Sequence, residues 1–152
     1  MENQDTRTDK TSDRRSSSSH LIQNMLDERK QLLGLWLQTS VLEPDKLEPE
    51  DHELLEEFCQ VLVDYIAAGH FGLYERIAAG KERRQGVAET AKKIYPKIEK
   101  TTQFALEFSE KYNSENNNKA VGNLSKDLSV LGEMLSTRLE LEDQLIARIL
   151  AG

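Results

Sequence analysis

Apolar residues recur at steps of three and four along four long segments of this chain, and this periodicity restricts its fold more than any other feature. The segments run from about Ser19 to Gln38, Pro49 to Ala68, Gln85 to Tyr112 and Lys119 to Leu150. Such a period places the apolar side chains on one face of an α-helix. No segment alternates with a period of two for long enough to predict a strand. The sequence therefore predicts an all-α fold, an antiparallel helical bundle of four long helices.

Prolines and glycines predict where these helices begin and end. Pro49 suits the first turn of a helix, because the N–H that proline lacks would be unpaired there anyway. Gly69 predicts a break between the second helix and a short accessory helix from about His70 to Ala79, which would stop at Gly80. These signals add one short helix to the four long ones.

Pro96 lies inside the Gln85–Tyr112 pattern and removes a backbone hydrogen bond from it. The helix is therefore expected to kink or divide near Tyr95. The Asn-rich residues 113–118 are expected to form a loop.

The first residues of the chain differ in composition from the rest. Residues 1–18 are rich in Ser, Thr, Asp and Arg and contain almost no apolar side chain, so we expect a disordered polar N-terminal arm. Residues 19–152 are numerous enough for one domain with a substantial core and too few for two. A single helical-bundle domain behind a polar arm is the predicted organisation.

The charge balance excludes some partners. The chain has 20 Lys and Arg against 27 Asp and Glu, a formal net charge of -7. A nucleic-acid-binding protein needs the opposite balance to neutralise phosphates, so we expect no direct contact with nucleic acid. The acidity either keeps the protein soluble or favours a basic protein partner.

Other features of the sequence indicate a cytoplasmic protein with no membrane contact. No apolar run approaches the roughly 20 residues that a membrane-spanning helix needs, and we find no signal-peptide pattern at the N-terminus. The single cysteine, Cys59, excludes an internal disulfide and fits a reducing compartment.

Enzymatic patterns are lacking as well. A carboxylate-bridged metal site in a bundle needs Glu-x-x-His pairs, and none of His20, His52 and His70 has a glutamate three residues before it. Cys59 and His70 would lie roughly 16 Å apart along a continuous helix, too far for a nucleophile and its base. No phosphate-binding loop or nucleophile elbow is present. We expect no enzyme activity, no metal and no cofactor.

A small acidic helical bundle could also be a histidine phosphotransfer domain. His70 is followed by Phe71 and Gly72, whereas such domains usually carry a Lys-Gly pair after the histidine. A signalling bundle, acting by phosphotransfer or as a scaffold for another regulator, is the alternative function.

Asp64 is unusual because it lies in a run of apolar and aromatic residues, within Phe58–Arg76, that otherwise resembles a protein core. A buried unpaired carboxylate costs several kcal/mol, so Asp64 should pair internally, face solvent or contact a partner. Arg29 is the candidate for internal pairing. Helical spacing places Asp64 on a strip of small and polar residues formed by Gln60, Asp64, Ala67 and Ala68.

Several runs resemble the regulator of sigma D family of anti-sigma factors, also called Rsd/AlgQ. They are FCQVLVDYIAAGHF at Phe58–Phe71, YERI at Tyr74–Ile77, DERKQLL at Asp27–Leu33, AKKIYP at Ala91–Pro96 with Thr102–Gln103 after it, and LEDQLI at Leu141–Ile146. The resemblance covers roughly residues 20–150.

The resemblance implies regulation of transcription, which in this family is associated with stationary phase. Its members bind the primary (housekeeping) sigma subunit of RNA polymerase, chiefly its C-terminal DNA-binding domain, and reduce its association with core enzyme and promoter. That domain is a basic helix-turn-helix module, for which an acidic helical surface can compete. We expect the chain to be a monomer when bound to sigma.

The resemblance also points to contact residues. The aspartate of the family's Val-Asp-Tyr triplet falls on Asp64, which becomes the expected contact with sigma. Gln60, Ala67 and Ala68 lie on the same strip, and Phe71 and Tyr74 could form an apolar rim beside it. Whether Asp64 reaches the partner directly or first pairs with Arg29 stays open at this point.

Overall fold

The computed structural model of the chain describes residues 2–78, 86–112 and 121–151, and for residues 2–18, Phe71, Arg76, Ala78, Val121 and Ala151 it describes only the backbone. Four long helices dominate: α1 (Glu2–Ser40), α2 (Pro49–Ala68), α4 (Val87–Lys111) and α6 (Leu124–Ala151). The shorter elements are η1 (Pro44–Lys46), η2 (Gly69–Tyr74), α3 (Glu75–Ala78) and η3 (Val121–Asn123). No strand occurs among the described residues, and the predicted all-α fold is confirmed.

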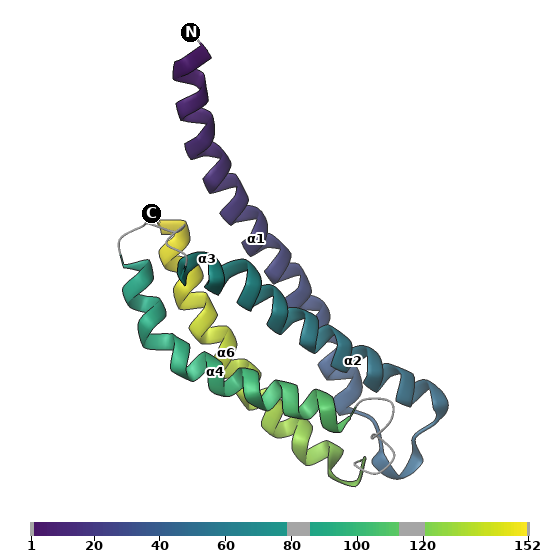
Figure 1. Cartoon of the computed structure of the whole chain (residues 1–152). Coiled ribbons are helices and arrows are strands. Elements are labelled where there is room, and N and C mark those ends of the chain that lie inside the picture. The colour runs from purple at the N-terminus through teal and green to yellow at the C-terminus, as the bar shows by residue number, and fades with distance from the viewer. Residues whose placement is uncertain (1, 79–85, 113–120, 152) are drawn as a thin grey trace.

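The four long helices form an antiparallel bundle. Figure 1 shows α1 running down, α2 up, α4 down and α6 up. α1 packs against α2 and α6, and α4 packs against the same two helices from the other side. Each helix therefore has two antiparallel neighbours, as in up-and-down bundles with short connections.

The start of α2 follows the sequence prediction. Pro49 occupies the first turn, and Glu48 and Asp51 form a capping box in which the Glu48 N–H donates to Asp51 Oδ2 at 2.9 Å. This arrangement satisfies backbone groups that the first helical turn leaves without partners. α4 continues through Pro96 without dividing, and its axis bends in Figure 1.

The first helix differs from the prediction at both ends. It begins at Glu2 instead of about Ser19, and it ends at Ser40 instead of Gln38. Residues 2–18 are helical in this structure, and Figure 1 shows them continuing past the other helices. These residues contain no proline or glycine that would interrupt a helix. Extending an existing helix is also easier than starting one, because each added residue forms a hydrogen bond. The division into an arm and a domain at residue 18 stays a prediction.

Gly69 does not break the helix that precedes it. Its backbone is right-handed helical, with φ -62° and ψ -48°, and the chain continues into the π-helix η2 and then into α3. Glycine permits a helix break but does not require one. The predicted end of the accessory helix at Ala79 and Gly80 and the predicted loop at residues 113–118 lie outside the described residues.

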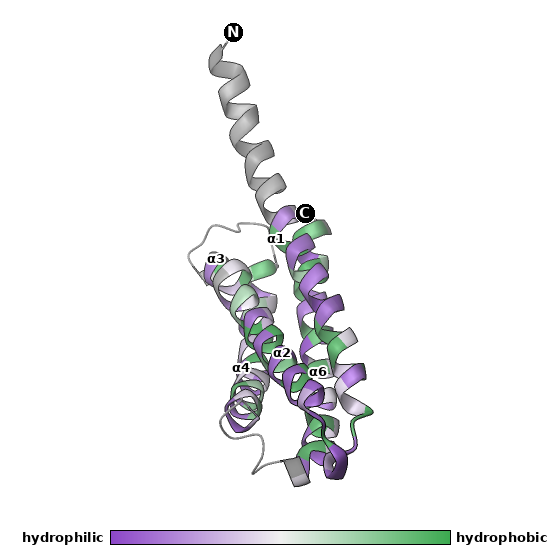
Figure 2. Ribbon diagram, turned by 90° about the vertical axis from the view of Figure 1, so that its right-hand side faces the viewer, coloured by the Kyte–Doolittle hydropathy of each residue, from purple (hydrophilic) through white to green (hydrophobic). Residues whose placement is uncertain are grey.

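The core consists of two hydrophobic clusters, one toward each end of the bundle. The first cluster joins α2 to the C-terminal part of α1, the C-terminal part of α4 and the N-terminal half of α6. The second cluster joins η2 and α3 to the remaining parts of α1, α4 and α6. Figure 2 shows the hydrophobic and hydrophilic sides of the helices that produce this arrangement.

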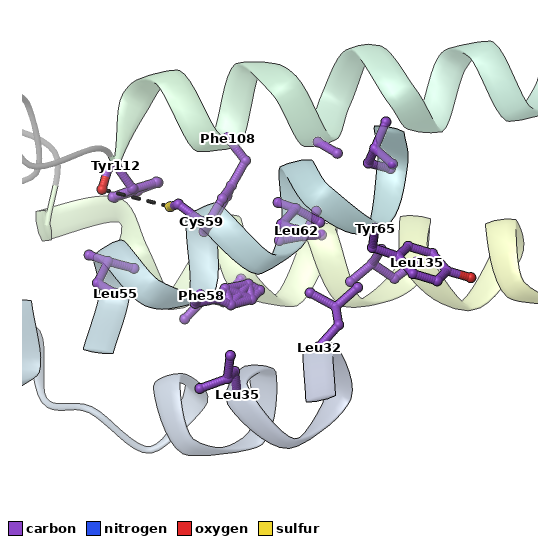
Figure 3. Packing of buried hydrophobic residues seen from close by; sticks show 14 of the residues in the cluster. Leu32, Leu35, Leu55, Phe58, Cys59, Leu62, Tyr65, Phe108, Tyr112 and Leu135 are labelled. Carbon is purple, nitrogen blue, oxygen red and sulfur yellow. Dashed lines mark hydrogen bonds between the residues drawn. The ribbon is translucent and has the colours of Figure 1, made fainter. Parts of the chain in front are cut away.

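Figure 3 shows the packing of the first cluster, in which Phe58 of α2 and Phe108 of α4 meet edge to face with ring centroids 5.9 Å apart. Cys59 is buried there, and its thiol donates to the carbonyl oxygen of Tyr112 at 3.8 Å. The hydroxyl of Tyr65 lies at the edge of the cluster and points out of it.

Candidate functional site

Asp64 lies on the exposed face of α2. Its Oδ1 accepts a hydrogen bond of 3.0 Å from the amide of Gln60, which is also exposed. Ala67 and Ala68 follow on the same side of the helix and are half-buried. The structure thus places the predicted strip at the surface, with Gln60 orienting the carboxylate.

Arg29 does not pair with Asp64, so the alternative of an internal Arg29–Asp64 pair is wrong. Its Nη1 donates to Asp143 Oδ1 at 2.7 Å, and its Nε donates to the hydroxyl of Tyr65 at 3.2 Å. Its Nη2 lies 3.5 Å from Glu142 Oε1, close enough for an ion pair, but forms no hydrogen bond. Burial alone would lower the pKa of Arg29, but the hydrogen bonds to Asp143 and Tyr65 raise it above its ordinary value. The guanidinium is therefore a fixed cation that is already engaged.

A second carboxylate, Glu28, faces Asp64 across the seam between α1 and α2. Burial and the negative charge of Asp64 raise the pKa of Glu28 above its ordinary value. Glu28 Oε2 is shielded from solvent and has no hydrogen-bond partner. Helical periodicity does not reveal that Glu28 lies near Asp64, because their proximity depends on how α1 and α2 pack. We call Asp64, Gln60 and Glu28 the acidic seam.

The exposed face of α2 extends the acidic seam toward the start of the helix. Glu53, Glu56 and Glu57 are exposed and lie within one to three helical turns before Gln60 and Asp64 on a similar side. Neighbouring carboxylates on one face create a negative potential that attracts a positively charged surface.

A layer of polar side chains, all buried except the half-buried Arg29, lies between the two hydrophobic clusters. We define this polar layer as Arg29, Tyr65, Tyr74, Thr101, Arg138 and Glu142. Glu142 is completely buried and lies at its centre. It accepts hydrogen bonds from the hydroxyl of Tyr65, from the hydroxyl of Tyr74 at 2.9 Å and from Arg138 Nε at 3.3 Å.

The other donors of Arg138 are satisfied by α4. Its Nη1 donates to Thr102 Oγ1 at 2.7 Å, to Thr101 Oγ1 at 3.1 Å and to the carbonyl oxygen of Ile98 at 3.4 Å. Burial of charge is tolerated when the charges are paired and hydrogen-bonded in this way. The polar layer thus ties α1, α2, η2, α4 and α6 to one group, the Glu142 carboxylate.

The sequence carries a signal for the polar layer that periodicity analysis alone did not use. On one stripe of α6 the buried leucines are Leu128, Leu131 and Leu135, followed further along by Leu145. Arg138 and Glu142 occupy the two positions between them that continue the same three-and-four spacing. A charged pair on an apolar helical face indicates a buried ion pair.

Of the two aromatic residues expected at the rim of the site, Tyr74 has a described side chain and Phe71 does not. Tyr74 is only 6% exposed and belongs to the polar layer and the second cluster, because η2 directs its hydroxyl to Glu142. Its predicted place on an apolar rim is therefore wrong. The side chain of Phe71 lies outside the described residues.

The described part of the chain has neither a membrane-spanning helix nor a cluster of metal-ligating side chains. None of its helices is long and apolar enough to cross a lipid bilayer. None of its side-chain clusters brings together three or more His, Cys, Asp or Glu that could hold a metal ion.

Comparison with known proteins gives a consistent result. Residues 5–150 match the family described as "Regulator of RNA polymerase sigma(70) subunit, Rsd/AlgQ". A protein named regulator of sigma D from Yersinia enterocolitica is 35% identical over 145 residues, covering 92% of this chain and 86% of the relative. Proteins of the same name from Yersinia pestis and Shigella boydii are 37% and 34% identical over 145 residues, covering 92% and 93% of this chain and 85% and 91% of the relatives.

Proposed function

This chain belongs to the Rsd/AlgQ family of regulators of the RNA polymerase sigma(70) subunit, and from that premise we propose that it is an anti-sigma factor. It binds the primary sigma subunit, chiefly the C-terminal DNA-binding domain, and withholds it from core enzyme and promoter. It acts in the cytoplasm as a monomer in a stoichiometric complex, without catalysis.

The acidic seam is the observation that supports this proposal. Asp64 is exposed, is oriented by Gln60 and forms no ion pair with any side chain that the structure describes, since Arg29 is engaged by Asp143 and the polar layer. An arginine of the partner could donate to Asp64 and to the unsatisfied oxygen of Glu28 together. Hydrogen bonds between a guanidinium and carboxylates are among the stronger polar contacts across an interface.

Competition with DNA follows from the charges involved. A helix-turn-helix domain presents basic side chains to the phosphates of its site. The exposed glutamates of α2 and the acidic seam offer the same side chains an alternative set of anions. A sigma domain bound in this way has its positive surface covered and cannot contact the promoter.

The test is binding of the purified sigma C-terminal domain to the Asp64→Ala variant, measured by calorimetry and by co-elution from a sizing column. Loss of one partner of a desolvated charge pair costs roughly 2–5 kcal/mol, so affinity should fall about 30-fold or more. Glu107→Ala, an exposed glutamate on α4, is the matched control and should bind normally.

Two results would contradict the proposal. Unchanged sigma binding by Asp64→Ala would remove the acidic seam from the interface, and loss of helical circular dichroism would show that Asp64 has a structural role. Uptake of phosphate on His70 from a phosphorylated donor, without sigma binding, would instead support the alternative of a signalling bundle.

A further inference from the structure

A cavity of about 560 Å³ opens beside the polar layer, on a different side of the molecule from the acidic seam. It is lined by η2 and α3, by α4 and by one residue of α6. Its volume lies within the range of about 300–1,000 Å³ that is typical of small-molecule sites. It adjoins a π-helix, an element that frequently marks functional sites.

Two tyrosine rings form a fixed wall of this cavity. Tyr74 and Tyr95 pack edge to face with centroids 5.4 Å apart, and the Tyr95 hydroxyl donates to the Tyr74 carbonyl oxygen at 3.2 Å. The hydroxyl of Tyr74 is held in turn by Glu142. Ile98, which is buried, completes the apolar surface. A ligand therefore meets aromatic and aliphatic atoms that are already ordered.

The inner end of the cavity offers no free charge to an anion. Arg138 lines it and is only 1% exposed, but its guanidinium pairs with Glu142 and donates to Thr102, another lining residue. Within the polar layer and its surface contact, the positive charges of Arg29 and Arg138 are balanced by Glu142 and Asp143. The inner wall of the cavity is thus polar, but its positive charge is balanced by neighbouring carboxylates.

The solvent side of the cavity carries two exposed carboxylates. Glu75 and Glu99 both line the cavity and are exposed, and neither forms an ion pair with another described residue. Negative charge next to aromatic rings favours a cation, because the ring faces also attract positive charge. An anionic ligand would be repelled at the entrance.

We propose that this cavity binds a small organic cation whose amine or guanidinium lies near Glu75 and Glu99 and whose apolar or aromatic body packs against Tyr74, Tyr95 and Ile98. The site is independent of the proposed sigma-binding function, because the acidic seam contributes none of its lining residues. The ligand class is defined by charge at one end and apolar surface at the other.

Three probes with the same ring and different charges test this proposal on the full chain. Tyramine is cationic, 4-ethylphenol is neutral and 4-hydroxyphenylacetate is anionic, and each is titrated while backbone amide shifts are recorded by NMR. Tyramine should shift the amides of η2 and α4 and bind at least about tenfold more tightly than the other two, a difference of about 1.4 kcal/mol. Arginine amide should shift the same amides.

Variants locate the charge that selects the cation. The double variant Glu75→Gln/Glu99→Gln should lose about tenfold or more in tyramine affinity, whereas Glu107→Gln on α4 should lose none. Equal binding of the three probes, tyramine shifts confined to other helices, or no binding of tyramine and arginine amide at millimolar concentration would each overturn the proposal. The probe series uses the unaltered chain, so it decides the matter even if the double variant fails to fold.

Discussion

Replacing Glu142 by glutamine should destabilise the protein strongly while hardly changing the volume of its core. Glutamine keeps one acceptor oxygen, but it removes the negative charge that faces Arg29 and Arg138. It also places an N–H₂ group opposite one of the two hydroxyls that donate to Glu142, that of Tyr65 or that of Tyr74.

The magnitude follows from the burial of these groups. Glu142 is 0% exposed and Arg138 is 1% exposed, so solvent cannot replace the lost partner. Breaking a buried ion pair by removing one member costs about 3–5 kcal/mol. Since the threonines of α4 still accept from Arg138, we expect a loss at the lower end, about 3 kcal/mol. For a chain of this size that corresponds to roughly 10 °C in Tm.

The assay is urea unfolding followed by circular dichroism at pH 7, with Glu140→Gln as the control. Glu140 is exposed on the same helix, and its substitution should change the free energy of unfolding by no more than about 0.5 kcal/mol. Adding Arg138→Met to Glu142→Gln should cost less than the two changes measured separately, because it removes the unpaired cation. A loss below about 1 kcal/mol for Glu142→Gln, or strictly additive effects, would refute the reasoning.

Three further predictions concern other parts of the bundle. Glu28→Gln should raise the urea midpoint at pH 7 yet weaken sigma binding in calorimetry. The pKa of Glu28 is raised in the folded state, so this group contributes most to stability at acid pH. That contribution is lost as the pH rises through the folded-state pKa. Equal or lower stability of this variant would contradict the destabilising effect of burying Glu28 beside the negative charge of Asp64. Gly132→Ala should lower the free energy of unfolding by about 1–3 kcal/mol, because an added Cβ would lie 2.7 Å from Trp36 Cζ2. The control Gly34→Ala should be neutral or stabilising, because an added Cβ there would have nothing within 4 Å. Cys59 should react with Ellman's reagent at pH 8 only as fast as the protein unfolds, because burial raises the pKa of its thiol to about 12. Rapid labelling of the folded chain would contradict this prediction and show that the structure around Cys59 opens locally.

The helices were predictable because their apolar periodicity is a local property of the sequence. Capping at Pro49 was equally local, and both agree with the structure. The partner of Arg29 was not predictable, because Asp143 and Glu142 come from a helix more than 100 residues away in sequence. Gly69 was misjudged because a glycine permits several backbone conformations, and tertiary packing selected a helical one.

The acidic seam shows the same limit. The sequence singled out Asp64, and helical spacing placed Gln60 beside it, since four residues make about one turn. Glu28 could be assigned only after α1 and α2 were packed together. A charge that interrupts an apolar run was a useful guide to a surface site at Asp64, whereas at Arg138 and Glu142 the same kind of interruption marked buried groups.

The polar layer determines the position of each helix along the bundle axis. Leucine-rich surfaces are non-directional and would accept neighbouring helices at more than one height. Sliding α6 by one turn, about 5.4 Å, would instead leave Arg138 and Glu142 facing apolar side chains. The polar layer thus fixes the axial register of helices whose apolar contacts alone would allow them to slide past one another. Because Glu28 and Asp64 come from different helices, the spacing between their carboxylates at the surface is set by charges hidden in the interior.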